Sequence, residues 1–183
     1  MAARSEAETN SLLVYKSPAR QGGVLYLANA DLAALVNEVL LATGVDPSSL
    51  KIEITESDMM QNPEAVTAVL KQIESQKIQT CLDDFGTGYS SLSYLQQLPI
   101  TFLKVDQSFI RRLGTDDDAL AIVKTIIVLA HQLGRQVIAE GVETAEHLTT
   151  LRLLGCEYGQ SYLFAKPLPC TEVSYFLASG RHW

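Results

Sequence analysis

The sequence predicts an α/β protein built from parallel βα units. From about residue 30 onward, short apolar segments rich in β-branched residues alternate with amphipathic helical segments. Successive units are separated by roughly the 30 residues that a βαβ element needs. No internal repeat, low-complexity tract or Pro- or Ser-rich linker divides the 183 residues, so the chain has the length and the apolar content to bury one core. These features leave two architectures open, a doubly wound sheet and a (β/α)8 barrel.

Four helices are predicted from their start and stop signals, which are a capping side chain at the beginning and in most cases a glycine at the end. They run from Asp31 to Gly44, from Asn62 to Ile73, from Asp116 to Gly134 and from Thr144 to Gly155. In the third helix the apolar residues lie on nearly every side, so we expect that helix to be buried.

Five short segments between these helices are predicted strands, because they are apolar and rich in residues that favour extended backbone. They cover residues 50–54, 78–82, 102–105, 137–139 and 158–163. The first 30 residues differ in character. Residues 12–16 and 24–27 are candidate strands on either side of a Pro- and Gly-containing turn, and residues 1–11 are expected to be a flexible tail.

Charge and composition narrow the classes of partner. The chain has 14 Lys and Arg against 21 Asp and Glu, a formal charge of −7, which disfavours binding to a nucleic-acid polymer. A phosphate-containing substrate would need a cation. No apolar run reaches the ~18 residues of a membrane span, and the N-terminus lacks the apolar stretch of a signal peptide, so we expect a cytoplasmic protein. Cys81, Cys156 and Cys170 are widely spaced and odd in number, which predicts buried free thiols.

Polar side chains lie at or just after the end of every predicted strand from residue 50 onward. They are Glu53, Glu56, Asp83, Asp84, Lys104, Asp106, Glu140, Glu143 and Gln160. Because the carboxyl ends of parallel strands meet on one face, these residues are expected to converge. Carboxylates gathered in one cleft repel each other unless a cation lies between them, and oxygen ligands suit Mg2+ or Mn2+. A single acidic strand end is usually a helix cap, but five such ends favour a metal site of the kind used in phosphodiester hydrolysis.

Five motifs in order carry a resemblance to a known family. They are Glu53-Ile-Thr-Glu-Ser, Asp83-Asp-Phe-Gly-Thr-Gly-Tyr-Ser-Ser-Leu, Leu103-Lys-Val-Asp-Gln-Ser-Phe, Ile138-Ala-Glu-Gly-Val-Glu-Thr and Gln160-Ser-Tyr-Leu-Phe-Ala-Lys-Pro-Leu. Together they resemble the EAL domain family, bacterial cyclic di-GMP phosphodiesterases built on a modified (β/α)8, or TIM, barrel. The clear similarity begins at about Asp31, and the resemblance implies one EAL-like domain over residues 12–183.

The resemblance implies a role for each position that matches a family motif. Glu53, Asp83, Asp84 and Glu140 would be ligands of Mg2+ or Mn2+, with Glu140 also the catalytic carboxylate and Lys104 beside the attacking water. Glu143 and Gln160 would complete the site, and Glu56 would anchor the loop over residues 85–92, which in the family also contributes to dimer contacts. The reaction implied is hydrolysis of cyclic di-GMP to linear pGpG. Whether Lys104 or Glu140 is the base stays open.

Two departures from the family pattern bear on activity. The Glu-Ala-Leu signature, which supplies a metal-ligand glutamate, is absent, and Tyr15 stands where a metal-ligand asparagine belongs. The resemblance thus implies a barrel incomplete at its N-terminal strands, partly patched by residues 12–28, and a homodimer that covers exposed strand edges. We expect weak or no hydrolysis. A fully active phosphodiesterase and a non-catalytic cyclic di-GMP receptor or protein-interaction module are the alternatives.

Overall fold

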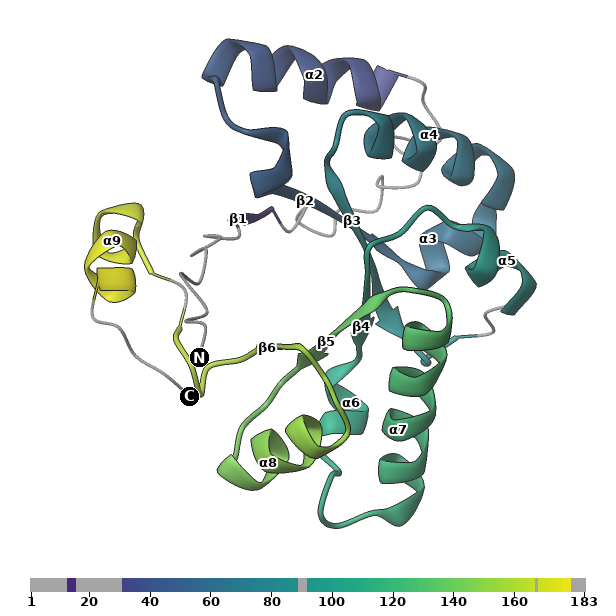
Figure 1. Cartoon of the computed structure of the whole chain (residues 1–183), viewed down its shortest axis with the longest axis vertical. Helices are drawn as coiled ribbons and strands as arrows, with labels where there is room; N and C mark the ends of the chain where they lie inside the picture. Colours follow the sequence, from purple (N-terminus) through teal and green to yellow (C-terminus); the bar gives the residue numbers. More distant parts are fainter. Residues whose placement is uncertain (1–12, 16–30, 89–91, 167, 179–183) are drawn as a thin grey trace, which may run out of the picture. The chain divides into compact units, whose positions relative to one another are not determined.

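The computed structural model of the chain describes residues 13–15, 31–88, 92–166 and 168–178. The described residues form two compact units. The first unit comprises Met1–Leu82 and Ser90–Thr101, and the second comprises Asp83–Tyr89 and Phe102–Trp183. Strands and helices alternate along both units (Figure 1). This alternation confirms the predicted α/β class, and six strands are present in the part of the chain that is described.

The first unit contains a parallel strand pair covered by helices. Strand β1 (Leu13–Tyr15) pairs in parallel with β2 (Leu50–Thr55), and β3 (Gln79–Phe85) begins in this unit and ends in the second. The helices of this unit are α2 (Asp31–Thr43), α3 (Glu56–Gln61), α4 (Pro63–Ser75) and α5 (Leu92–Gln97), with a 3-10 turn η1 (Pro47–Ser49). Helices α2 and α4 contact each other, and their apolar faces share one buried cluster.

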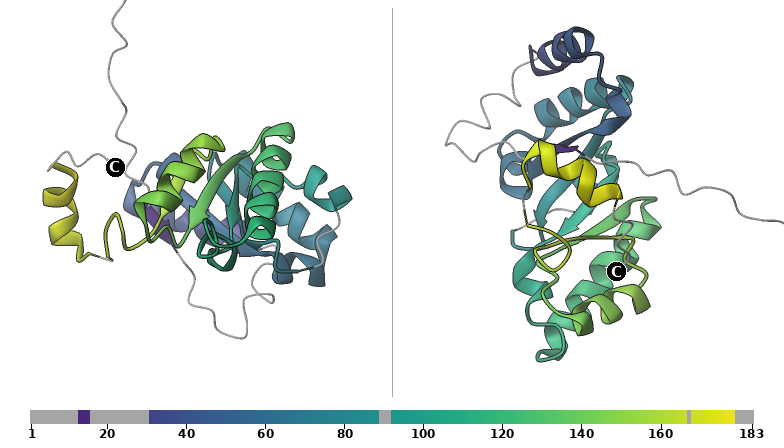
Figure 2. Two further views of the ribbon diagram at one scale, coloured as in Figure 1. Left: turned by 90° about the horizontal axis from the view of Figure 1, so that it is seen from below. Right: turned by 90° about the vertical axis from the view of Figure 1, so that its left-hand side faces the viewer.

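The second unit places three strand ends together. Strands β4 (Phe102–Val105), β5 (Gln136–Glu140) and β6 (Tyr158–Gln160) pair in parallel, in that order. The register sets Lys104 beside Ile138 and Glu140 beside Gln160. The helices are α6 (Gln107–Ile110), α7 (Asp117–Gln132), α8 (Ala145–Leu153) and α9 (Cys170–Ala178). Helix α7 packs on β4 and β5, as the views in Figures 1 and 2 show. Because the three strands are parallel, their carboxyl ends meet at one edge.

Local capping explains where the predicted helices begin. The Asn62 side chain accepts a hydrogen bond from Ala65 N at 3.3 Å, and Asp116 Oδ1 accepts from Asp118 N at 2.9 Å. Thr144 Oγ1 accepts in the same way from His147 N at 3.0 Å. Each bond satisfies an amide of the first helical turn that has no partner within the helix. The predicted starts of α4, α7 and α8 are therefore confirmed.

Two predictions about the second unit are wrong. Helix α7 is not buried on all sides, because it packs on β4, β5 and α6 while Ile122 and Val128 remain 38% and 51% exposed. Strand β6 ends at Gln160 rather than at residue 163. The chain turns there, since Ser161 O accepts a hydrogen bond from Phe164 N at 3.3 Å.

The predictions for the first 30 residues are tested only in part. Strand β1 confirms part of the candidate strand over 12–16, whereas the tail over 1–11 and the candidate strand over 24–27 lie outside the described residues.

Cys81 is buried and Cys156 partly buried, and both are free thiols. Among the described residues, no helix has both the length and the apolar character needed to cross a membrane. A cytoplasmic location stays a prediction.

Candidate active site

A buried lysine lies at the centre of the candidate site. Lys104 belongs to β4, and its side chain is 0% exposed. Its Nζ atom lies 2.6 Å from Oε1 of Glu140, the last residue of β5, and 3.3 Å from Oδ1 of Asp83, near the end of β3. A buried ammonium group is tolerated when charged partners replace the water that it has lost. Residues of three strands thus place the lysine ammonium between two carboxylates.

The two neighbouring aspartates are oriented by a turn in the backbone. Asp84 has a φ of 57°, in the left-handed region that few residues other than glycine, asparagine and aspartate adopt. Its amide donates a hydrogen bond to Asp83 Oδ1 at 2.9 Å, and its carbonyl accepts one from Thr87 Oγ1 at 2.9 Å. Asp83 is buried and Asp84 is partly exposed. The turn therefore presents two carboxylates side by side at the end of β3.

Three carboxylates of this site lie close enough to share a metal ion. One oxygen each of Asp83, Asp84 and Glu140 lies within 4.8 Å of the others. Their formal charge of −3 is offset only in part by the Lys104 ammonium. Carboxylate oxygens are hard ligands of the type that Mg2+, Mn2+ and Ca2+ prefer. The donor set therefore fits a hard divalent cation.

Gln160 is tied to Glu140 through the backbone. The two residues are partners in the β5–β6 register, and Gly141 N donates a hydrogen bond to Gln160 O at 2.9 Å. The ring of Phe164 packs on Gly159, where a Cβ atom would come within 2.9 Å of Phe164 Cε2. The side chain of Gln160 itself is exposed. The β5–β6 register thus places Gln160 beside Glu140, and its contact with the metal or with water stays a prediction.

Glu143 has a different environment in the structure. Its side chain is 54% exposed, and its Oε1 accepts a hydrogen bond from Arg111 Nε at 2.9 Å. Its amide donates to Nδ1 of the buried His147 at 3.4 Å. The Glu143 carboxylate does not belong to the group formed by Asp83, Asp84 and Glu140 among the described residues. Its contact with a metal or with water stays a prediction.

Glu53 and Glu56 belong to the first unit. Glu53 is partly buried on β2, and Glu56 is 2% exposed at the first position of α3. Thr55 Oγ1 caps this helix by accepting a hydrogen bond from Asp58 N at 3.1 Å. The roles of Glu53 as a metal ligand and of Glu56 as a loop anchor stay predictions.

Sequence reasoning assigned Asp106 to the strand ends and missed Arg111. Asp106 is the cap of α6, since its Oδ1 accepts a hydrogen bond from Ser108 N at 2.9 Å. Arg111 follows α6 and reaches Glu143, 32 residues further along the chain. The Asp106-x-Ser108 spacing could have revealed the cap, because this pattern is common at helix starts. No local signal could have revealed the partner of Arg111.

Comparisons with known proteins show the family to which the chain is similar. The sequence model of the EAL domain matches residues 25–167. The bifunctional diguanylate cyclase/cyclic di-GMP phosphodiesterase MucR of Pseudomonas aeruginosa is 40% identical over 149 residues, which are 81% of this chain and 22% of MucR. The chain spans about a fifth of the length of the curated relatives that it matches.

Solved structures show the same fold. The EAL domain of Mycobacterium smegmatis DcpA aligns with a TM-score of 0.82 and 38% identity, over 87% of this chain and 71% of that chain. The manganese/cyclic di-GMP complex of Klebsiella pneumoniae BlrP1 aligns with a TM-score of 0.71 and 32% identity, over 78% of this chain and 36% of that chain. These matches confirm the TIM-barrel-like α/β class. The chain therefore belongs to the EAL domain family, the domain of cyclic di-GMP signalling that is related to phosphodiesterases.

Proposed function

We propose that the chain binds cyclic di-GMP together with Mg2+ or Mn2+ and hydrolyses one phosphodiester bond to give pGpG, at a rate far below that of a complete EAL domain. The observation that carries the proposal is the buried Lys104, whose Nζ lies 2.6 Å from Glu140 and 3.3 Å from Asp83. Burying these three charges together costs stability relative to an apolar core, which is typical of a reaction site.

The residues proposed to hold the cation are Asp83, Asp84 and Glu140, with Glu53 added by the resemblance to the family. A bound divalent cation would supply the positive charge that a phosphodiester needs in order to approach a chain of net charge −7, and would polarise the phosphate. Gln160, at the end of β6 next to Glu140, is proposed to contact water at the rim.

Lys104 and Glu140 are proposed to handle the proton of the attacking water. At 2.6 Å, Lys104 Nζ and Glu140 Oε1 form a charge-assisted hydrogen bond. With the lysine charged, Glu140 would accept the proton and the Lys104 ammonium would stabilise the hydroxide that forms; Lys104 could be the base only if its own proton had first passed to Glu140. Asp83 Oδ1 holds the lysine from a second side and keeps its ammonium directed at the site.

The proposed slow rate follows from the sequence at two positions. The chain has no Glu-Ala-Leu motif, and in β1 a tyrosine at position 15 replaces the family's asparagine. A phenol is a poorer ligand for a hard cation than an amide carbonyl. Catalysis with two metal ions requires both ions in place, so the loss of ligands should lower the rate by orders of magnitude.

The test uses the purified chain with cyclic di-GMP and Mn2+. Calorimetry should show nucleotide binding that depends on Mn2+ and is lost in Asp83→Asn. Chromatography should show pGpG above the level of a Glu140→Gln control, but slowly compared with the EAL domain of MucR assayed alongside. Absence of binding at high micromolar nucleotide would refute the proposal. A rate equal to that of the MucR domain would favour the fully active alternative.

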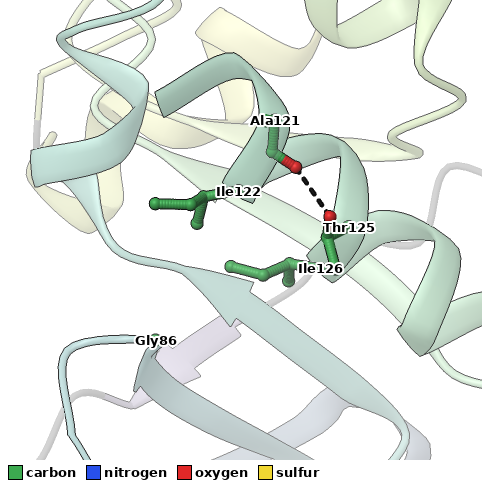
Figure 3. Close-up of a pocket in the computed structure, with 5 residues that line it drawn as sticks. All are labelled: Gly86, Ala121, Ile122, Thr125 and Ile126. Carbon is green, nitrogen blue, oxygen red and sulfur yellow. Dashed lines mark hydrogen bonds between the residues drawn. The ribbon is translucent and has the colours of Figure 1, made fainter. Parts of the chain in front are cut away.

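The proposal includes a homodimer, and an apolar surface in the second unit supports it. Gly86, in the loop that contributes to dimer contacts in the family, lines an open pocket with Ala121, Ile122, Thr125 and Ile126 of α7 (Figure 3). Ile122 is exposed, and so is Val128, which lies one to two helical turns further along α7. A second copy of the chain would cover these side chains.

Light scattering after size-exclusion chromatography tests the dimer. The wild-type chain should elute at twice its mass of 20.0 kDa, and Ile122→Glu should shift it to the monomer. Leu153→Glu is the matched control, because Leu153 is 83% exposed on α8 and lies outside this pocket. A wild-type monomer would contradict the dimer.

A further inference from the structure

A close approach between two backbone segments lies directly beside Glu140. A Cβ atom added to Gly141 would lie 2.8 Å from Gln107 Cβ and 3.5 Å from Gln107 Cα. The first distance is shorter than real Cβ contacts, and the atoms met belong to the base of the Gln107 side chain and to its backbone. Gln107 is the first residue of α6, three residues after Lys104. Only glycine therefore fits against the start of α6 at this position.

The peptide that carries Glu140 is held on two sides. On one side, Glu140 Oε1 bonds to Lys104 Nζ at 2.6 Å and Gly141 contacts Gln107. On the other side, Gly141 N donates a hydrogen bond to Gln160 O at 2.9 Å. Gly141 also has a φ of 72°, a backbone conformation that residues with a side chain rarely adopt. The Glu140-Gly141 peptide is thus fixed between the 104–107 segment and the end of β6.

From this arrangement we infer that Gly141 and Gln107 are positioning residues, and that their close contact sets the Glu140 carboxylate at the distance from Lys104 that metal binding and hydrolysis require. The inference rests on the proposed function of this site. Neither residue needs to touch the substrate. Their effect passes through the location of Glu140, because a shift of ~1 Å at a reacting group can lower a rate about a hundredfold.

The chain offers a matched control for the backbone conformation. Gly134, after α7, has a φ of 70°, almost the same as that of Gly141, but nothing lies within 4 Å of a Cβ added to it. Gly134→Ala therefore introduces the left-handed strain without a collision. Gly141→Ala introduces both the backbone strain and the collision, so the difference between the two variants isolates the contact with Gln107.

The experiment compares the wild-type chain with Gly141→Ala, Gly134→Ala and the double variant Gly141→Ala/Gln107→Gly, which removes the Gln107 Cβ that the added methyl group would meet. Electron paramagnetic resonance measures Mn2+ affinity, and pGpG formation gives kcat and KM. We expect Gly141→Ala to weaken Mn2+ binding and to lower kcat by about ten- to a hundredfold, with KM changed less than about twofold. Gly134→Ala should match the wild type, and the double variant should recover part of the loss.

A readout that needs no metal separates this inference from the proposed function. The 15N resonance of Lys104 Nζ reports on its ion pair with Glu140 in the metal-free protein, and it should move in Gly141→Ala and return toward the wild-type position in the double variant. If the wild type binds no Mn2+, the proposed function fails and this resonance alone decides the inference. An unmoved resonance, equal Mn2+ affinity in Gly141→Ala and Gly134→Ala, or no recovery in the double variant would overturn it.

Discussion

Lys104 Nζ lies 2.6 Å from Glu140 Oε1, and the two side chains are 0% and 12% exposed. The pair is therefore shielded from water on the lysine side and open to it only at the carboxylate. With Asp83 Oδ1 at 3.3 Å, the lysine neutralises part of the negative charge that the three carboxylates bring together. Its removal should consequently affect stability as well as chemistry.

Lys104→Met should destabilise the metal-free protein by about 3 to 5 kcal/mol, because the buried Asp83 and the partly buried Glu140 lose their cation. Urea denaturation measures this loss, and Mn2+ should restore part of it by replacing the missing positive charge. pGpG formation should disappear. Arg112→Met is the control, since the Arg112–Asp116 pair is largely exposed and should be worth only about 0.5 kcal/mol. Equal losses in the two variants would contradict the central role of Lys104.

Substitutions at Asp84 should separate backbone conformation from metal binding. Asp84→Gly suits the φ of 57°, so the metal-free protein should keep its melting temperature, while Mn2+ affinity falls at least about tenfold through loss of one carboxylate. Asp84→Val should lower both, since a β-branched residue in this region costs about 1 to 2 kcal/mol. Calorimetric melting and Mn2+ titration check the pair. Unchanged Mn2+ affinity in Asp84→Gly would remove Asp84 from the ligand set.

Cys156 should make stability fall at high pH. Burial is the main cause that raises the pKa of Cys156 from 9.0 to about 11, and the nearby Glu157 adds to it. Between pH 9 and pH 11 the unfolded chain has lost the thiol proton while the folded chain keeps it, so unfolding is favoured as pH rises through this window. Cys156→Ala should flatten the dependence of the melting temperature on pH there. Identical curves for both proteins would disprove the shift.

Alkylation tests the same thiol independently. Cys156 should react slowly with iodoacetamide at about pH 8, because the reactive thiolate forms only as pH approaches about 11. Cys81, which is 0% exposed, should react more slowly still and is the internal reference in the same digest. Rapid labelling of Cys156 under these conditions would contradict the raised pKa.

Glu157 should contribute to stability and not to catalysis. Its Oε2 accepts a hydrogen bond from Val137 N at 3.0 Å, and its Oε1 lies 3.0 Å from His131 Nε2. Glu157→Ala leaves the Val137 amide without this acceptor and should lower the free energy of unfolding by about 1 to 3 kcal/mol. Glu157→Gln keeps an acceptor and should lose less. Urea denaturation checks both, and a loss of Mn2+ affinity in either variant would contradict a purely structural role.

The features that the sequence predicts well are those set by neighbouring residues. The caps at Asn62, Asp116 and Thr144 are formed within three residues, so the starts of α4, α7 and α8 could be recognised locally. The rule that parallel strands end on one face was enough to predict that Asp83, Lys104 and Glu140 converge.

The features that could not be predicted depend on the fold. Which side chains of α7 are covered depends on its packing against β4, β5 and α6, and nothing in the sequence distinguishes the exposed Ile122 and Val128 from the buried apolar residues of this helix. The Arg111–Glu143 pair joins residues 32 positions apart in the sequence, and no local pattern links them. Likewise, the need for glycine at position 141 follows from the nearness of Gln107, which no spacing reveals.

The contact of Phe164 with Gly159 has a consequence for how the chemistry of this domain can vary. Strand β6 has only three residues, so its own hydrogen bonds hold its register weakly. A slip by one position would bring Ser161 or Gly159 opposite Glu140 in place of Gln160. The aromatic ring fits only over a residue without a side chain, and it thereby locks the strand at a single position. A side chain gained at position 159, which has no proposed role in hydrolysis, could therefore move Gln160 from its place beside Glu140 without altering any of the groups proposed to react.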